Sequence, residues 1–155
     1  PGGGGGRRAA PNRYHARAHA ADVLQAVHFF LAPCGFARVL TAPEQLALLL
    51  GAAVHDYRHP GRSNLFITKT QGDLAMIYND ASVLENFHIS QALILMKEER
   101  YNFVRYLDTA SYATFRKYII GLVLATDLKF HFDLLGEFNA FTAEVLGAGA
   151  AAGGG

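Results

Sequence analysis

Apolar side chains recur at helical spacing near the beginning of the chain. Between residues 16 and 31 they follow one another at steps of three or four: Val23, Val27, Phe30 and Leu31. Such spacing places them on one face of an α-helix. Pro33 and Gly35 come directly afterwards and are typical of a helix end. The pattern therefore predicts a helix over residues 16–31.

Three further helices are indicated along the chain. Residues 43–54 begin with Pro43 and Glu44, which suit a first helical turn. Ser82 to Glu85 has the pattern of a capping box and predicts a helix that continues to about residue 97. Residues 110–132 carry an apolar stripe of Phe115, Ile119, Leu122, Thr126 and Phe130. Residues 60–64 read as an irregular loop, and because no alternating strand pattern of useful length occurs, we expect an all-α fold.

Composition narrows the possible classes of protein. The chain has 155 residues, of which 51% are hydrophobic, and a net charge of +1, so it is one domain or less and offers no global field for nucleic acid. Its apolar runs are shorter than the roughly 20 residues that span a bilayer. The single cysteine fits a reducing, cytoplasmic setting. We expect the Gly-rich ends, residues 1–11 and 146–155, to be disordered.

Histidines and one aspartate supply the candidate chemistry. The adjacent pair His55-Asp56, together with the distant His19, offers two imidazoles and a carboxylate to one divalent ion, and the aspartate has a second oxygen that can bridge to another ion. This is the ligand set of a metal-dependent phosphoester hydrolase. His15 and His19 are four apart and share one helix face, with Asp22 one turn beyond as a partner that could orient His19. Taken singly, each histidine is better explained as an ordinary surface or core residue with a satisfied hydrogen bond, and only the joint pattern of His19, His55, Asp56, His59 and Asn64 points to a site.

Longer blocks of sequence resemble the catalytic domain of class I 3′,5′-cyclic nucleotide phosphodiesterases, in the HD superfamily. The family signature begins with His-Asp, an apolar residue, any residue and His. A small residue, Asn or Gln and an apolar residue follow at fixed spacing. Residues 55–66 (HDYRHPGRSNLF) satisfy every position of this signature. Residues 14–25 (YHARAHAADVLQ), 74–86 (LAMIYNDASVLEN) and 123–131 (VLATDLKFH) are similar to other family blocks, in family order. The resemblance covers about residues 12–139 and implies a multi-helix HD-type domain.

The resemblance implies a binuclear metal site and a cyclic nucleotide substrate. His19, His55 and Asp56 match ligands of a tightly bound ion, usually zinc, and Asp56 also matches the bridge to a second ion, usually magnesium or manganese. His15 matches the general acid that protonates the departing 3′ oxygen, while metal-bound hydroxide attacks phosphorus.

Further family positions surround this centre. Four of them match polar groups that hold metal-bound water or line the site: His59, Glu85, Asn64 and His88. Tyr14 and Leu128 match the substrate pocket, which His15 also borders. Glu85 is equally well explained by the capping box with Ser82.

Departures from the family pattern leave other readings open. Arg58 stands where an acidic residue is common, and Phe87 replaces the first histidine of a usual pair. After Asn139 no residue matches the family's second metal-binding aspartate or its purine-binding glutamine, so the domain is expected to be incomplete on its C-terminal side. The isolated chain is then a fragment of an active phosphodiesterase, or a non-catalytic metal-binding remnant that binds a partner or itself through exposed apolar helix faces. A third reading is another HD-type phosphohydrolase.

Overall fold

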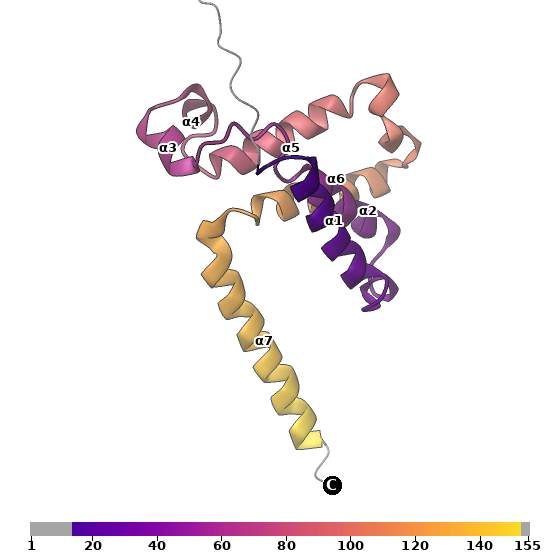
Figure 1. The fold of residues 1–155 in the computed structure, drawn as a ribbon. Helices are drawn as coiled ribbons and strands as arrows, with labels where there is room; N and C mark the ends of the chain where they lie inside the picture. Colours follow the sequence, from indigo (N-terminus) through magenta and orange to yellow (C-terminus); the bar gives the residue numbers. More distant parts are fainter. Residues whose placement is uncertain (1–13, 153–155) are drawn as a thin grey trace, which may run out of the picture.

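The computed structural model describes residues 14–152, which form helices joined by turns and loops and contain no strand (Figure 1). The α-helices are α1 (Arg17–Leu31), α2 (Ala42–Val54), α3 (Asn64–Lys69), α4 (Asp73–Ile77), α5 (Val83–Leu95), α6 (Thr109–Leu124) and α7 (His131–Ala152). Short 3-10 helices lie at Phe36–Arg38, Glu99–Tyr101, Phe103–Tyr106 and Leu128–Phe130. The all-α prediction is confirmed. The predicted bounds of α1, α2 and α5 agree with the structure to within two residues.

The core lies where α2 and α5 pack against α6. Phe115 and Ile119, both from the stripe predicted over residues 110–132, are fully buried there. Gly51 of α2 faces α6, where a Cβ at this position would meet Leu122 Cβ at 3.8 Å, an ordinary van der Waals contact. This packing fixes the C-terminal end of α2, from which His55 and Asp56 follow.

The N-terminus of α2 agrees with the sequence prediction, with Pro43 and Glu44 in its first turn, whereas the N-terminus of α5 differs from it. The Glu44 carboxylate accepts hydrogen bonds of 2.7 Å from both the backbone N–H and the hydroxyl of Thr41, so a capping box stabilises α2. The predicted box at α5 is wrong, because Ser82 has a left-handed backbone with φ of 43° and its side chain makes no cap bond. Instead, Asn64 Oδ1 accepts the backbone N–H of Leu84 at 2.8 Å.

The single helix predicted over residues 110–132 is divided in two. α6 ends at Leu124. The Asp127 carboxylate then accepts a hydrogen bond from the backbone N–H of Lys129, two residues further along the chain. Lys129 Nζ lies 3.1 Å from Asp127 Oδ2 and donates a 2.8 Å hydrogen bond to Ser82 Oγ, which ties this turn to the start of α5. These polar contacts redirect the chain although its apolar spacing continues, and α7 begins at His131.

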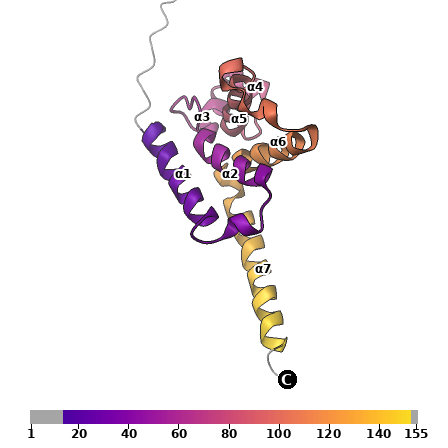
Figure 2. The same cartoon turned by 90° about the vertical axis from the view of Figure 1, so that its right-hand side faces the viewer.

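The last helix extends away from the other elements, with its C-terminal end far from them in both views (Figures 1 and 2). Its large apolar side chains are exposed: Phe132, Leu134, Leu135, Phe138, Phe141, Val145 and Leu146. α7 reaches Ala152, so residues 146–152 are helical rather than part of the predicted disordered tail; alanine is the strongest helix former. The other predicted disordered segment, residues 1–11, and residues 153–155 lie outside the described residues. Among the described helices, none has the length and apolar character needed to cross a bilayer.

Candidate metal centre

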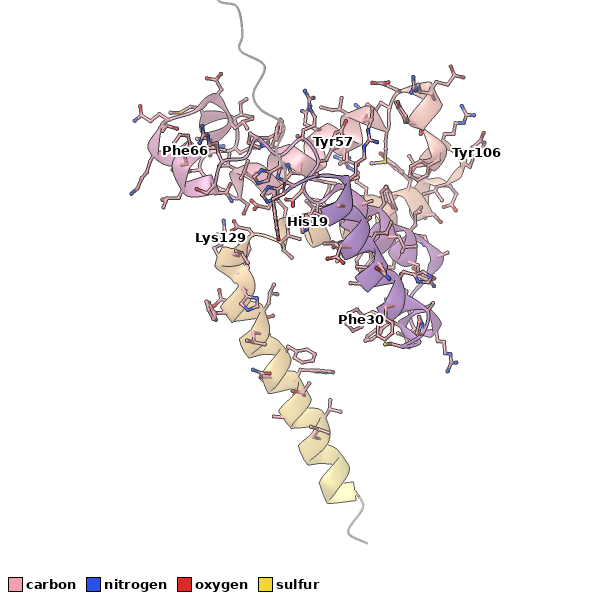
Figure 3. All side chains as sticks on the ribbon, in the orientation of Figure 1. His19, Phe30, Tyr57, Phe66, Tyr106 and Lys129 are labelled. Atoms are coloured by element: carbon pink, nitrogen blue, oxygen red, sulfur yellow. The ribbon has the colours of Figure 1, made fainter. Side chains whose placement is uncertain are left out.

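Segments far apart in the sequence bring the predicted histidines and aspartate together. His15 precedes α1 and His19 lies in its first turn, while His55 and Asp56 follow α2 and His88 lies on α5. Figure 3 shows His19 where α1 meets the region of α2 and α5, at a distance from Phe30 near the other end of α1. The fold therefore gathers these side chains at one end of α1.

The atoms of His19, His55 and Asp56 form a compact triangle. His19 Nε2 and His55 Nε2 are 3.1 Å apart, and each lies 3.2 Å from Asp56 Oδ2. A tetrahedral zinc ion with ligands at about 2.0–2.1 Å has neighbouring ligand atoms about 3.3–3.4 Å apart. The triangle thus has nearly the dimensions of one face of a zinc coordination tetrahedron, and the three residues fit a divalent metal.

Backbone carbonyls set the orientation of two imidazoles. His55 Nδ1 is 2.9 Å from the Ala52 carbonyl oxygen, and His88 Nδ1 is 2.8 Å from that of Tyr57. A carbonyl only accepts hydrogen bonds, so each Nδ1 carries the proton. In the neutral ring Nε2 then presents its lone pair, which at His55 is directed into the triangle.

The surroundings of Asp56 favour the ionised form of its carboxyl group. Burial raises the pKa of this carboxyl, but the hydrogen bond with His55 and the nearby imidazoles outweigh that effect and lower it to about 2. When the His55 ring is protonated on both nitrogens, its Nε2–H can donate to Asp56, and this hydrogen bond raises the pKa of His55. Asp56 is consequently ionised at neutral pH and available as an anionic ligand. Its second oxygen, Oδ1, lies 3.8 Å from His88 Nε2.

His15 and His59 border the triangle on the side of Asp56. His15 Nε2 is 3.9 Å from Asp56 Oδ2, and the rings of His15 and His59 stack with centroids 3.7 Å apart and planes at 11°. These two histidines and Asp56 also bring ligand-type atoms close together. However, imidazole lone pairs lie in the ring plane, and those of two nearly parallel rings do not converge on one point. The stacked pair is therefore poorly arranged to hold one ion jointly.

His59 is held in a specific tautomer by its own loop. The backbone N–H of Gly61 donates a 2.9 Å hydrogen bond to His59 Nδ1, so in the neutral ring the proton is on Nε2. Burial, followed by the charge of His15, lowers the pKa of His59 to about 4. Burial likewise lowers the pKa of His88. At neutral pH His59 is thus a neutral hydrogen-bond donor.

Asn64 and Glu85 form a polar bridge beside the centre. Asn64 Nδ2 donates a 2.9 Å hydrogen bond to Glu85 Oε2, while its amide oxygen accepts the N–H of Leu84. The amide of Asn64 therefore both caps α5 and holds the Glu85 carboxylate next to the triangle. Asp22 is exposed, and His19 contacts His55 and Asp56 rather than this aspartate.

A cavity of about 490 Å³ opens from the triangle. Tyr14, Glu85 and Leu128 line it together with the three clustered residues, whereas His15, which was also expected to border the substrate pocket, lines a neighbouring cavity. Its remaining wall is largely apolar and was not foreseen: Val23, Val27, Leu48 and Leu122. Helical spacing marked Val23, Val27 and Leu122 as core residues, and nothing in that spacing distinguishes a core wall from a cavity wall.

Comparisons with known proteins identify the family of this chain. The family model described as 3′,5′-cyclic nucleotide phosphodiesterase matches residues 14–147. The probable 3′,5′-cyclic phosphodiesterase pde-1 of Caenorhabditis elegans is 47% identical over 121 residues, which are 78% of this chain and 18% of that protein. The dual specificity calcium/calmodulin-dependent 3′,5′-cyclic nucleotide phosphodiesterase 1B of Mus musculus is 44% identical over 122 residues, 79% of this chain and 23% of the relative.

The human protein of the same name also shares 44% identity over 122 residues. This chain spans 18% to 23% of the length of these curated relatives. The family match runs from Tyr14, which precedes the first histidine of the cluster, through α7 as far as residue 147. It includes every residue of the metal triangle and of the cavity beside it. The chain belongs to the 3′,5′-cyclic nucleotide phosphodiesterase family.

Proposed function

We propose that this chain provides the metal-binding and proton-donating part of an enzyme that hydrolyses 3′,5′-cyclic nucleotides to 5′-monophosphates. The observation that carries the proposal is the triangle of His19 Nε2, His55 Nε2 and Asp56 Oδ2, with sides of 3.1–3.2 Å. Family membership supplies the reaction class, since the relatives are named as cyclic nucleotide phosphodiesterases.

The donor set favours particular metals. Two imidazoles and one carboxylate suit zinc, which binds nitrogen and oxygen ligands in tetrahedral sites. Asp56 Oδ1 remains available to a second, harder cation such as magnesium or manganese. Divalent ions bound here would supply Lewis acidity toward the phosphoryl oxygens and a nucleophilic water at neutral pH.

The neighbouring side chains then have distinct roles. We assign proton donation to the leaving 3′ oxygen to His15, because its Nε2 faces Asp56 Oδ2 at 3.9 Å from outside the triangle. His59 stacks on His15 and so restricts the orientation of that ring, and its neutral Nε2–H can donate to a water. His88, through its Nε2 near Asp56 Oδ1, borders the second metal position.

The cavity gives the substrate a place beside the metal triangle. Its volume of about 490 Å³ lies within the usual range of small-molecule pockets. Asn64 holds Glu85 at the polar end of this space, where the phosphate would lie. Tyr14 and Leu128 border the same cavity and would contact the sugar or base of the nucleotide.

A chimera tests the proposal, because this chain corresponds to about a fifth of each relative. Residues 14–147 would replace the matching segment of the Mus musculus enzyme, and cyclic AMP and cyclic GMP hydrolysis would be measured. We expect the chimera to hydrolyse at least one of them. The H15A chimera should lose about 10²–10⁴-fold in kcat while keeping its bound metal, since general acid catalysis typically contributes that much.

Metal content separates this outcome from the alternatives. A folded, metal-loaded chimera that hydrolyses neither nucleotide would overturn the proposal and favour a non-catalytic metal-binding role. Hydrolysis of other phosphoesters but not of cyclic nucleotides would favour another HD-type phosphohydrolase. If the H15A chimera lost its metal and the H55A chimera kept it, the assigned roles of the two histidines would be reversed.

A further inference from the structure

A second cavity, of about 300 Å³, meets the metal triangle at His19 and Asp56. It is lined by His15, by Arg17 at the start of α1 and by Arg58 in the turn after α2. The contacts of Asp56 Oδ2 with His19 and His55 hold the beginning of α1 against this turn. The same junction that forms the metal site therefore brings two arginines to one cavity.

Among the described residues that line this cavity, arginines outnumber carboxylates. Within the part of the chain that the structure describes, neither Arg17 nor Arg58 forms an ion pair with a carboxylate. Asp56 is the only acidic residue in the lining among residues 14–152, and its oxygens face imidazoles. Two arginines thus line this space without a carboxylate partner in the described chain.

Arg58 is held in position by a neutral partner. Its Nη1 donates a 2.6 Å hydrogen bond to Gln91 Oε1 on α5, and its backbone has the left-handed φ of 62°. This bond fixes the side chain without neutralising it. A guanidinium group has five N–H donors in a planar fork, so several remain for a ligand. That fork matches the oxygens of a phosphate group.

We propose that Arg17 and Arg58 form an anion subsite beside the metal centre that binds the dianion of a phosphate monoester. The ligand class rests on the proposed function, in which a cyclic diester with one negative charge becomes a 5′-monophosphate with close to two at neutral pH. The additional positive charge of this cavity attracts the product more strongly than the substrate. The subsite therefore retains product and makes the centre sensitive to inhibition by phosphate monoesters.

Calorimetric titration of the chain, with and without zinc, tests this subsite with three probes: inorganic phosphate, adenosine 5′-monophosphate and adenosine. We expect both phosphates to bind without metal and adenosine not to bind. R17Q and R58Q should each weaken phosphate binding by about tenfold, the scale of one charge-assisted hydrogen bond. R58K should lie between R58Q and the unaltered chain. R62Q is the matched control, because Arg62 stacks on Phe66 and does not line the cavity.

The possible results separate the subsite from the metal site. Phosphate binding that needs zinc and is unchanged in R17Q and R58Q would mean that the ion alone holds it, and would overturn the proposal. No phosphate binding in either state would overturn it too, as would equal weakening by R62Q. Circular dichroism of each variant verifies its helix content. Because no hydrolysis is measured, a failure of the subsite is distinct from a failure of the proposed enzymatic function.

Discussion

The metal centre and most of α7 lie within the family match. They differ in whether their side chains find partners within the chain. At the centre, polar groups that would be costly to bury contact one another and the backbone, as His55 does with Asp56 and the Ala52 carbonyl. On α7, Phe138 and Phe141 are each 63% exposed. The centre therefore has its polar groups paired within the chain and its donor atoms close together, whereas α7 leaves a large apolar surface exposed.

The largest expected effect follows from breaking the triangle. His55→Ala removes one of three ligands whose atoms are preorganised, and we expect zinc affinity to fall by at least about 100-fold, beyond the loss usual for residues that merely orient a ligand. Competition with a chromogenic chelator measures the affinity. His28→Ala, on the exposed last turn of α1, should bind zinc as before. Unchanged affinity in His55→Ala would show that the ion lies elsewhere.

On α7 the corresponding test concerns self-association. We expect the chain to associate through the apolar side chains of this helix, and the double variant F138E/F141E should weaken that association by more than tenfold, since each large apolar side chain contributes roughly 1.5–3 kcal/mol when buried. Sedimentation velocity over a concentration series measures it. The variant N139E/A143E adds the same charges at other exposed positions of α7 and should have a smaller effect. A monomeric unaltered chain would contradict the prediction.

The comparison also shows which parts of the molecule can be predicted from sequence. Helical spacing predicted α1, which packs against α2, and the residues Pro43 and Glu44 predicted the start of α2. It could not predict the break after α6, where the apolar spacing continues but Asp127, Lys129 and Ser82 form a polar contact over 47 residues of sequence. Local pattern contains no information about such a distant partner.

At the site, the residue types were predictable and their arrangement was not. The motif around His55-Asp56 identified the clustered residues, and the structure brings the predicted residues to one end of α1. The tautomers of His55 and His59 depend on backbone groups of Ala52 and Gly61, which any sequence possesses. The cap of α5 by Asn64 depends on contact across 20 residues, so the local match at Ser82 was misleading.

Near the metal centre, replacement of Asn64 tests whether Asn64 or Ser82 caps the N-terminus of α5. Asn64→Ala removes the acceptor for the Leu84 N–H and the donor to Glu85, so we expect the free energy of unfolding to fall by about 1–2 kcal/mol. Ser82→Ala should cost less, because the Ser82 side chain makes no cap bond to α5 and contacts only the turn before α7, through the half-exposed Lys129 and Asp127. Urea denaturation measures both. A larger loss in Ser82→Ala would restore the capping box predicted from the sequence.

The smallest expected effect lies at the turn between the core and α7. Burial raises the pKa of the Asp127 carboxyl, but hydrogen bonds from the backbone and side chain of Lys129, with Ser82, lower it below the ordinary value of 3.8. A carboxyl whose pKa is depressed by folding stabilises the protein above its unfolded pKa, and this contribution is lost as the pH falls through the lower folded value. Asp127→Asn should therefore reduce the free energy of unfolding by about 1 kcal/mol at pH 7, and by less near pH 3.

Urea denaturation at both pH values measures this difference, with the exposed Asp133→Asn on α7 as the matched variant. Comparison of each variant with the unaltered chain at the same pH cancels the acid sensitivity of other groups, including Asp56. An equal loss at pH 7 and pH 3 would show that Asp127 acts through its shape and neutral hydrogen bonds. A loss confined to neutral pH would instead mean that its charge holds the turn, and with it the cavity wall at Leu128, in place.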